Sequence, residues 1–183
     1  MRHAAEKYVT DYAMLDSPVG SLLIGGQAGN VLLIGFPSGC YAVAPDNTWP
    51  LDDALYPDAR HQLEDYFAGR CRVFGFPMRM IGTDFQKTVW SALIEIPTGE
   101  TRTYAAIASS IGRPNAIRAV GAANGANPLA IAVPCHRLLG SNGSLIKFGG
   151  GLPVKQYLLD LESKQTTARS RASVLRRDGR RHE

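Results

Sequence analysis

Residues 127–137 read Asn-Pro-Leu-Ala-Ile-Ala-Val-Pro-Cys-His-Arg, and the rest of the chain is organised around them. The five central apolar residues, some of them β-branched, predict a short buried strand. Because Pro134 has no backbone N–H, the strand is expected to end there. Cys135 would then stand at the end of a stiff element, where the cationic groups of His136 and Arg137 favour a thiolate. The alternative is that Cys135 is only a small buried apolar side chain, as most free cysteines are.

The composition is that of an ordinary globular protein. The chain has 183 residues, of which 45% are hydrophobic and 20% charged, so one large or two small domains are expected. No apolar run approaches the roughly 18 residues of a membrane span, and residues 1–6 lack the apolar core of a signal peptide. Three cysteines without a pairing pattern favour a cytoplasmic protein. The histidines and cysteines show no metal-ligand spacing, so neither a metal nor another cofactor is expected.

The net charge of +4 is unevenly distributed along the chain. Residues 1–81 hold six Lys/Arg and nine Asp/Glu, a balance of −3, and residues 82–163 hold seven and five, a balance of +2. Residues 164–183 hold seven and two, a balance of +5, with little apolar content. These stretches are the expected N-terminal domain, C-terminal domain and disordered basic tail. The tail suits weak attraction to phosphates, and a solvated chain end without a partner is the alternative.

Residues 1–81 have the pattern of a small α/β domain. A helix is expected to begin at Pro57, carry an apolar stripe and end before Gly69. Alternating apolar residues at 72–80 predict a half-buried strand. No group of side chains in this part suggests chemistry, so we interpret it as a structural domain. Three further strands are expected at 12–15, 21–24 and 31–34.

The C-terminal half begins with three predicted helices. Thr83 and Gln86 form a capping box at the start of the first, and Thr103 can cap the second. A short link leads to the third helix at 115–125, so the last two form a candidate helix-turn-helix. Many helix pairs of this kind bind no DNA, so this pattern alone does not assign a function.

The predicted third helix carries small residues on its outer surface. Glycine within a helix costs about 1 kcal/mol relative to alanine, so its presence needs a reason. One reason is close helix packing, and another is close approach to a nucleic-acid backbone with Arg118 as the single long side chain. The inner face is expected to hold Ile117, Val120 and Gly121.

The last helix is expected from Pro153 to about Ser163. Glu162 follows Leu158 by four positions and therefore lies on the apolar stripe. A buried carboxylate needs a partner, and His136 is the candidate in this half of the chain. The alternative is that Glu162 lies at a frayed helix end and is solvated.

Two thiol mechanisms compete for Cys135. A cysteine hydrolase needs a base in contact with the thiol, an orienting group and an oxyanion hole. Neighbouring residues of an extended segment point to opposite sides, so direct contact between Cys135 and His136 is unfavourable. An indirect relay fits better, in which Glu162 holds His136 and the imidazole withdraws the thiol proton through a water. A thiolate made in this way forms a stable thioether with an alkyl carbon.

A series of motifs between residues 82 and 162 matches one known family. The motifs are Gly-Thr-Asp-Phe-Gln at 82–86, Val-Trp at 89–90, Ile-Pro at 96–97, Gly-Glu-Thr at 99–101, Tyr104, Arg-Ala-Val-Gly at 118–121, Asn-Pro at 127–128, Pro-Cys-His-Arg at 134–137 and Gly-Gly at 150–151. In these motifs the chain resembles the O6-alkylguanine-DNA alkyltransferases, the methylated-DNA–protein-cysteine methyltransferases. Residues 8–80 are similar to the family's N-terminal domain only in size, order of elements and the turn at 16–20.

The resemblance implies an α/β (α+β) fold. The N-terminal domain would be RNase H-like, with a small β-sheet and a helix, and the C-terminal domain mainly helical and winged-helix-like. The implied function is DNA repair, in which Cys135 takes the alkyl group from O6-alkylguanine, or O4-alkylthymine, once and irreversibly. The implied partner is double-stranded DNA, bound by a monomer with cooperativity left open, and no membrane is involved.

The resemblance also implies catalytic roles. Cys135 is the alkyl acceptor, His136 and Glu162 form the water-mediated relay, and Asn127 braces the active-site turns by hydrogen bonds.

DNA and substrate contacts are implied in the same way. Arg118 would fill the place of the flipped-out nucleotide, with the third helix in the minor groove, and Tyr104 would rotate that nucleotide and hydrogen-bond the guanine leaving group. Further DNA contacts are implied for Asn115, Ala119 and Asn124, and further pocket contacts for Leu138, Phe148 and Gly149.

Some positions depart from the family's pattern. Phe148 keeps an aromatic ring but lacks the usual hydroxyl, and Lys147 puts a charge at the pocket mouth, so the range of accepted alkyl groups is open. Gly149 removes a hydrogen bond that a serine supplies in some members, and the zinc ligands of some members are not evident.

A non-catalytic alkyltransferase-like protein is a second hypothesis, but such proteins lack the acceptor cysteine.

Overall fold

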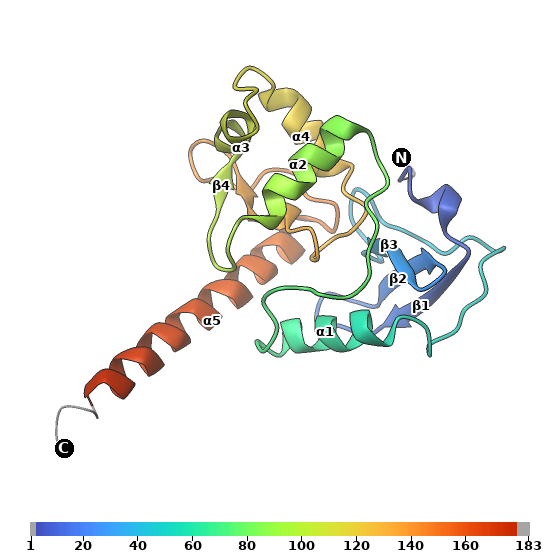
Figure 1. The fold of residues 1–183 in the computed structure, drawn as a ribbon, viewed down its shortest axis with the longest axis horizontal. Helices are drawn as coiled ribbons and strands as arrows, with labels where there is room; N and C mark the ends of the chain where they lie inside the picture. The colour runs from blue at the N-terminus through green and yellow to red at the C-terminus, as the bar shows by residue number, and fades with distance from the viewer. Residues whose placement is uncertain (1–2, 179–183) are drawn as a thin grey trace.

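Two groups of elements lie side by side in the computed structural model, which describes residues 3–178 (Figure 1). The first group holds the 3-10 helix η1 (Glu6–Tyr8), the strands β1 (Asp11–Leu15), β2 (Leu22–Gln27) and β3 (Asn30–Gly35), and the helix α1 (Pro57–Phe67). The second group holds the helices α2 (Asp84–Ile94), α3 (Tyr104–Ser110), α4 (Ile117–Gly125) and α5 (Leu152–Asp178), the 3-10 helix η2 (Cys135–Arg137), and the two-residue strands β4 (Arg102–Thr103) and β5 (Leu138–Leu139). This mixture confirms the expected α+β fold class.

The three longer strands form an antiparallel sheet in chain order. Ala13 pairs with Ile24, and Ile24 pairs with Ile34. Alternate residues of β2 face different layers, so Leu22 and Ile24 enter the main core whereas Leu23 joins a smaller cluster beside η1. The three strands expected in this region are confirmed.

Helix α1 covers one face of this sheet (Figure 1). It begins with Pro57 at its first position and buries Ala59, Leu63 and Tyr66 against the main core. Gly69 follows in a left-handed conformation, with φ of 79°, which glycine adopts without strain. The predicted start and end of this helix are confirmed.

The strand predicted at 72–80 is wrong, although its alternating burial is correct. Phe76 is buried and its neighbours Gly75 and Pro77 are exposed. Only one bridge joins this segment to the sheet, at Met78 opposite Val31. Apolar alternation reports which side chains are buried, but a proline without an N–H and a glycine interrupt the hydrogen-bonded ladder that a strand needs.

Helices α2, α3 and α4 pack together above the N-terminal group. The capping box of Thr83 and Gln86 is present, and the Thr103 hydroxyl accepts the Ala106 N–H at 3.1 Å. The Trp90 indole N–H donates to the Ala123 carbonyl at 2.8 Å and ties α2 to α4. These contacts confirm the predicted caps and the helix-turn-helix pair α3–α4.

The predicted inner face of α4 needs one correction. Val120 is fully buried, but Ile117 is 44% exposed. The helix begins only at Ile117 instead of at residue 115, so Ile117 lies in its first turn. Ala123 and Asn124 complete the buried face instead.

The buried strand predicted within 127–137 is also wrong. Residues 129–133 are buried but form only isolated bridges, and Ile131 has a φ of 70°. Extended backbone cannot have positive φ, so the chain folds back on itself at this point. A short apolar run predicts burial without distinguishing a strand from a buried turn.

The last helix extends beyond the end predicted near Ser163, whereas the disorder expected for the tail at 164–183 stays a prediction. Helix α5 continues without a break to Asp178, and residues 179–183 lie outside the described residues. No Gly or Pro occurs between Ser163 and Asp178 to stop the helix, and Ala, Arg, Lys and Gln there are good helix formers. Gln165 is buried, and its side-chain amide donates to the Tyr66 carbonyl at 3.3 Å.

One apolar cluster runs through both groups of elements. It includes Ile24 and Leu63 of the first group together with Trp90, Leu129 and Leu158 of the second. The core is therefore continuous across residue 81, and the division into domains at 81/82 stays a prediction. Within residues 3–178, no helix is long and apolar enough to cross a membrane.

Candidate active site

The Asn127 side chain holds the turn that leads to the thiol. Its Nδ2 donates to the Val133 carbonyl at 2.9 Å, and its Oδ1 accepts the Leu129 N–H at 3.0 Å. Both bonds are buried, so the amide replaces the strand partner that these backbone groups lack. Pro134, with φ of −80° and ψ of 62°, then makes an inverse γ-turn, in which the Cys135 N–H donates to the Val133 carbonyl at 2.8 Å.

We expect Asn127→Ala to destabilise the protein by about 1–3 kcal/mol, because it leaves the buried Leu129 N–H without its partner and removes one of the two hydrogen bonds to the Val133 carbonyl. Urea unfolding measures this change. Asn142→Ala is the matched control: Asn142 is exposed and accepts one backbone N–H, from Ser144 at 3.1 Å. Equal losses in the two variants would contradict the bracing role.

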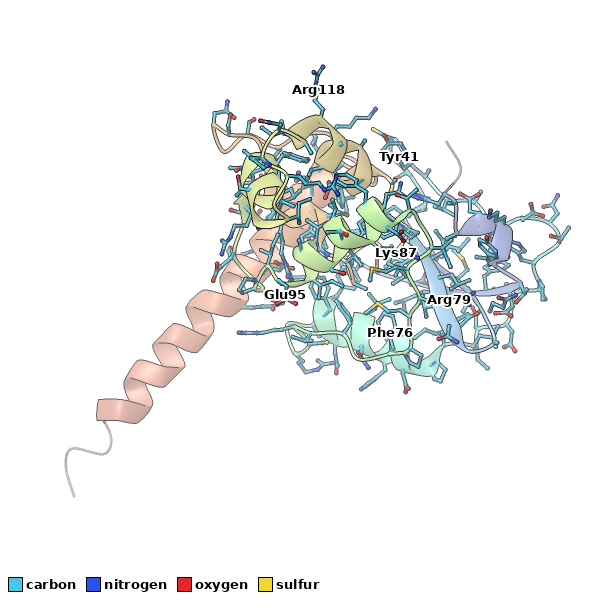
Figure 2. All side chains as sticks on the ribbon, turned by 45° about the horizontal axis from the view of Figure 1, so that its top comes forward. Tyr41, Phe76, Arg79, Lys87, Glu95 and Arg118 are labelled. Carbon is cyan, nitrogen blue, oxygen red and sulfur yellow. The ribbon has the colours of Figure 1, made fainter. Side chains whose placement is uncertain are left out.

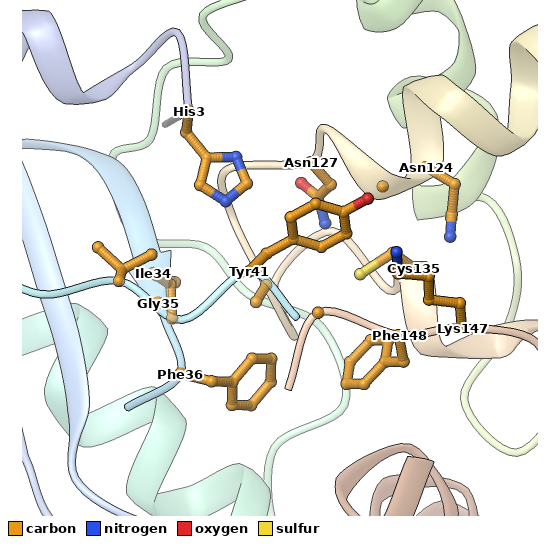
Figure 3. A pocket seen from close by; sticks show the side chains of 14 residues that line it. His3, Ile34, Gly35, Phe36, Tyr41, Asn124, Asn127, Cys135, Lys147 and Phe148 are labelled. Carbon is orange, nitrogen blue, oxygen red and sulfur yellow. The ribbon is translucent and has the colours of Figure 1, made fainter. Parts of the chain in front are cut away.

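Cys135 lies buried in η2, with 6% of its surface exposed at the wall of a cavity. Burial raises the pKa of this thiol, while the Asn127 amide and the positive charge of Lys155 act in the opposite direction. The cavity wall also includes His3, Tyr41 and Phe148, so both groups of elements enclose the thiol (Figure 3).

His136 contacts Glu162 as expected, with Nε2 2.8 Å from Oε1 and both side chains fully buried. Burial alone would raise the pKa of Glu162, but hydrogen bonds and charges from His136 and Arg137 hold it well below its usual value. Burial lowers the pKa of His136, so the imidazole is neutral at pH 7. Because the ionised carboxylate can only accept, Nε2 carries the proton, and Nδ1 is left as an acceptor. That Nδ1 has no hydrogen-bond partner among the described residues.

Arg137 is directed toward Glu162 and does not act as a free cation beside the thiol. Its Nε donates to Glu162 Oε2 and its Nη2 to Oε1, both at 2.9 Å. This bidentate pair satisfies the carboxylate and fixes its plane. Arg137 therefore does not favour the thiolate from close by, as the sequence suggested. It holds Glu162, which in turn contacts His136.

Tyr66 also belongs to the hydrogen-bond network around Glu162, although it was not among the predicted site residues. Its hydroxyl donates to Glu162 Oε1 at 2.9 Å from the buried face of α1. Burial and the charge of Glu162 raise its pKa well above the usual value, so it remains a donor. The signal was available, because a buried tyrosine needs a partner for its hydroxyl. The N-terminal half thus reaches the candidate relay directly.

Lys155 was also missed. Its side chain is fully buried, and its Nζ donates to the carbonyls of Leu138 and Ile146, joining the two ends of the loop between them. Burial lowers its pKa to about 8. A lysine beside the apolar stripe of α5 looks solvated in the sequence, so no pattern signalled its burial.

A groove of about 510 Å³ runs along α3 and α4, beside the cavity. Tyr104 and Arg118 line it, and Arg118 projects outward from α4 (Figure 2). Asn115 and Ala119 are exposed on the same helix-turn-helix. Asn124 is 5% exposed and borders both groove and cavity, and its Oδ1 finds no partner within residues 3–178.

The three predicted pocket residues have different surroundings. Gly149 and Phe148 line the cavity, but the Phe148 ring packs edge-on against Phe36 at 5.5 Å and is 3% exposed. Leu138 is fully buried, does not line the cavity and contributes its carbonyl to Lys155. Among the described residues, no three His, Cys, Asp or Glu side chains form a group that could hold a metal ion.

Comparison with known proteins agrees with this arrangement. Residues 84–164 match the family described as 6-O-methylguanine DNA methyltransferase, DNA binding domain. The methylated-DNA–protein-cysteine methyltransferase of Methanosarcina acetivorans is 46% identical over 151 residues, which are 82% of this chain and 97% of that protein. The Mycobacterium tuberculosis protein of that name is 44% identical over 86% of this chain and 94% of its own length. The crystal structure of Mycobacterium tuberculosis OGT in complex with DNA matches with a TM-score of 0.80 at 42% identity, over 85% of this chain and 94% of that one. The chain therefore belongs to the family of methylated-DNA–protein-cysteine methyltransferases.

Proposed function

We propose that this protein repairs duplex DNA by moving the alkyl group of O6-alkylguanine, or O4-alkylthymine, onto Cys135, once per molecule. The observation that carries the proposal is the position of Cys135. The thiol lies at the wall of a cavity, next to a groove on a helix-turn-helix and beside a buried histidine–carboxylate pair. The relatives compared above are named for action on methylated DNA.

The relay begins at Glu162, which stays ionised and holds the Nε2 proton of His136. Nδ1 then accepts the thiol proton of Cys135 through a bridging water. This transfer is needed because burial raises the thiol pKa, and only the thiolate is a strong nucleophile.

In the transfer step the Cys135 sulfur attacks the alkyl carbon and forms a C–S bond. The bond from that carbon to guanine O6 breaks, and its electron pair leaves with the guanine. The proton taken from the thiol is returned to the base, so guanine leaves neutral and no other reactant is consumed. Tyr104 lines the groove side of this site, and burial raises the pKa of its hydroxyl, which therefore stays protonated and able to donate to the departing base.

A thioether resists hydrolysis by this relay, because an alkyl carbon on sulfur has no carbonyl for a water to attack. Repair should therefore stop at one alkyl group per protein molecule. Titrating the protein against excess methylated duplex should give a plateau at a one-to-one ratio. A product yield that keeps rising past the amount of protein would overturn the single-use mechanism.

The groove suggests how the base reaches the cavity. A base inside a duplex cannot contact a buried thiol, so the nucleotide must rotate out of the stack. Arg118 is exposed on α4, on the groove wall, and it is long enough to occupy the space that the nucleotide leaves. The small residues Ala119 and Ala122 let α4 approach the DNA backbone closely.

We expect Arg118→Ala to slow transfer from duplex DNA by roughly tenfold to a hundredfold, because unstacking costs a few kcal/mol without a group to fill the gap. Transfer from free O6-alkylguanine base should stay within about twofold, since no stack has to open. Arg79→Ala removes an exposed arginine far from the groove and is the matched control (Figure 2). Equal losses on duplex and free base would remove the flipping role of Arg118.

A further inference from the structure

The groove and the Cys135 cavity meet at a shared wall. The residues common to both linings are Tyr41, Asn124, Gly125 and Lys147. Asn124 and Gly125 belong to α4, and their backbone is fixed by the helix. Tyr41 and Lys147 come from two loops, one in each half of the chain, so these are the members of the wall that can move without unfolding a helix.

The loop that carries Tyr41 is seated firmly on the Gly149–Gly150 segment. The Tyr41 N–H donates to the Gly149 carbonyl at 3.1 Å. Gly39 has a φ of 108°, and a side chain there would meet that same carbonyl at 2.2 Å, so only glycine allows this approach. The backbone beside Tyr41 is therefore anchored, and the freedom to move lies in its side chain.

The Tyr41 ring lies at the boundary between the groove and the cavity, because it belongs to both linings, and Figure 3 shows it among the side chains around Cys135. It lies close enough to α4 that a side-chain carbon at Gly125 would be in contact with it at 3.6 Å. The Lys147 ammonium is 5.5 Å from the ring centroid, in cation–π range. Phe148 lines the cavity but not the groove, and its ring packs against Phe36. Tyr41 is thus the aromatic ring at the cavity mouth.

The cavity behind this wall has a volume of about 30 Å³. A single water needs about 10–15 Å³ by this measure, so there is space for two or three waters and not for a purine. A base with its alkyl group can reach the Cys135 sulfur only if the wall opens.

We infer that Tyr41 and Lys147 form a gate between the DNA groove and Cys135, and that the Tyr41 ring limits the size of the alkyl group accepted. The inference rests on the proposed function for its substrate, an alkylated base that arrives from the groove. Separation of the two side chains opens the wall, and a closed gate keeps solutes away from the thiol between repair events. The N-terminal half thereby supplies a specificity-determining residue to the site.

The gate can be tested without DNA. Iodoacetamide and N-benzyliodoacetamide share one reactive group and differ in bulk, so the ratio of their rates at Cys135 reports access and is independent of the thiol pKa. Peptide mapping separates Cys135 from Cys40 and Cys71. We expect Tyr41→Ala to raise the ratio of the N-benzyliodoacetamide rate to the iodoacetamide rate about tenfold. Lys147→Met removes only the cation–π contact and should raise this ratio about two- to fivefold.

Two variants make the result specific. Tyr41→Phe keeps the ring and should leave the ratio within about twofold of the wild type, as expected for a ring over a cation. Tyr8→Ala is the matched control, because Tyr8, like Tyr41, is a ring under a lysine, with Lys7 Nζ 4.8 Å from its centroid, and lines neither cavity nor groove. A ratio unchanged in Tyr41→Ala, or raised equally in Tyr8→Ala, would overturn the gate.

A second measurement uses duplex DNA and separates the gate from the repair function. Tyr41→Ala should raise the rate of benzyl transfer relative to methyl transfer by a similar factor. If the wild-type protein transfers no alkyl group from DNA, the repair function fails, and the reagent ratio still decides whether the gate exists. If transfer occurs and its benzyl-to-methyl ratio is unaltered in Tyr41→Ala, the control of alkyl size by Tyr41 is wrong.

Discussion

Cys135→Ser is expected to lower alkyl transfer from DNA by roughly 10⁴-fold or more, as is found when the nucleophile of a catalytic unit is removed. A serine hydroxyl has a far higher pKa than a thiol, and the neutral His136 is too weak a base to ionise it. DNA affinity should remain within about twofold, because Cys135 lines the cavity and not the groove. Transfer is measured with radiolabelled methyl groups in duplex DNA, and affinity by fluorescence anisotropy at fixed salt.

The matched control for this substitution is Cys40→Ser. Cys40 is exposed and lies outside both cavity and groove linings, so its loss should leave transfer unaltered. Transfer that survives in Cys135→Ser and is lost in Cys40→Ser would mean that the nucleophile has been assigned to the wrong cysteine.

Glu162→Gln is expected to destabilise the protein by about 3–5 kcal/mol, because it leaves the buried Arg137 cation without its opposite charge. The same change replaces one carboxylate oxygen by an NH2 donor and removes the negative charge that holds the His136 Nε2 proton, so transfer should fall by about 10²–10⁴-fold. Glu100→Gln is the control. Its partner Arg102 lies at 2.8 Å in a pair that is about half exposed, and its loss should cost less than about 1 kcal/mol. Urea unfolding compares the two variants.

The pH dependence of stability gives a second readout for Glu162. Its pKa in the folded protein lies below its ordinary value of 4.5. The carboxylate therefore stabilises the folded protein fully above that ordinary value, and this contribution is lost as pH falls toward the folded-state pKa. The wild type should lose free energy of unfolding below about pH 4.5 more steeply than Glu162→Gln. Parallel curves for the two proteins would show that the carboxylate is not held in its ionised form.

The helices of the C-terminal half and the contact between His136 and Glu162 could be predicted, because they follow from spacings of a few residues along the chain. A four-residue spacing placed Glu162 on the buried face of α5, and the cost of an unpaired buried carboxylate led to His136. The caps at Thr83 and Thr103 were predicted for the same reason, since a cap depends on residues three positions apart.

The parts that failed depend on contacts between distant segments. The apolar run within 127–137 predicts a strand, because periodicity cannot show that the Asn127 amide bonds the backbone groups that a neighbouring strand would bond. Tyr66 and Lys155 reach the site from outside the matching motifs, and only the folded arrangement brings them to Glu162 and to the loop carbonyls. Tyr41 lies in a loop without any motif, so its place at the cavity mouth could not be predicted.

The central claim is that Cys135 itself keeps the alkyl group. Its most direct test is the mass of the intact protein after incubation with duplex DNA containing O6-methylguanine, followed by peptide mapping. We expect every active molecule to gain the mass of one methyl group in place of one proton, carried by the peptide that contains Cys135. Repaired DNA with an unmodified protein, or a methyl group on any other residue, would contradict this account.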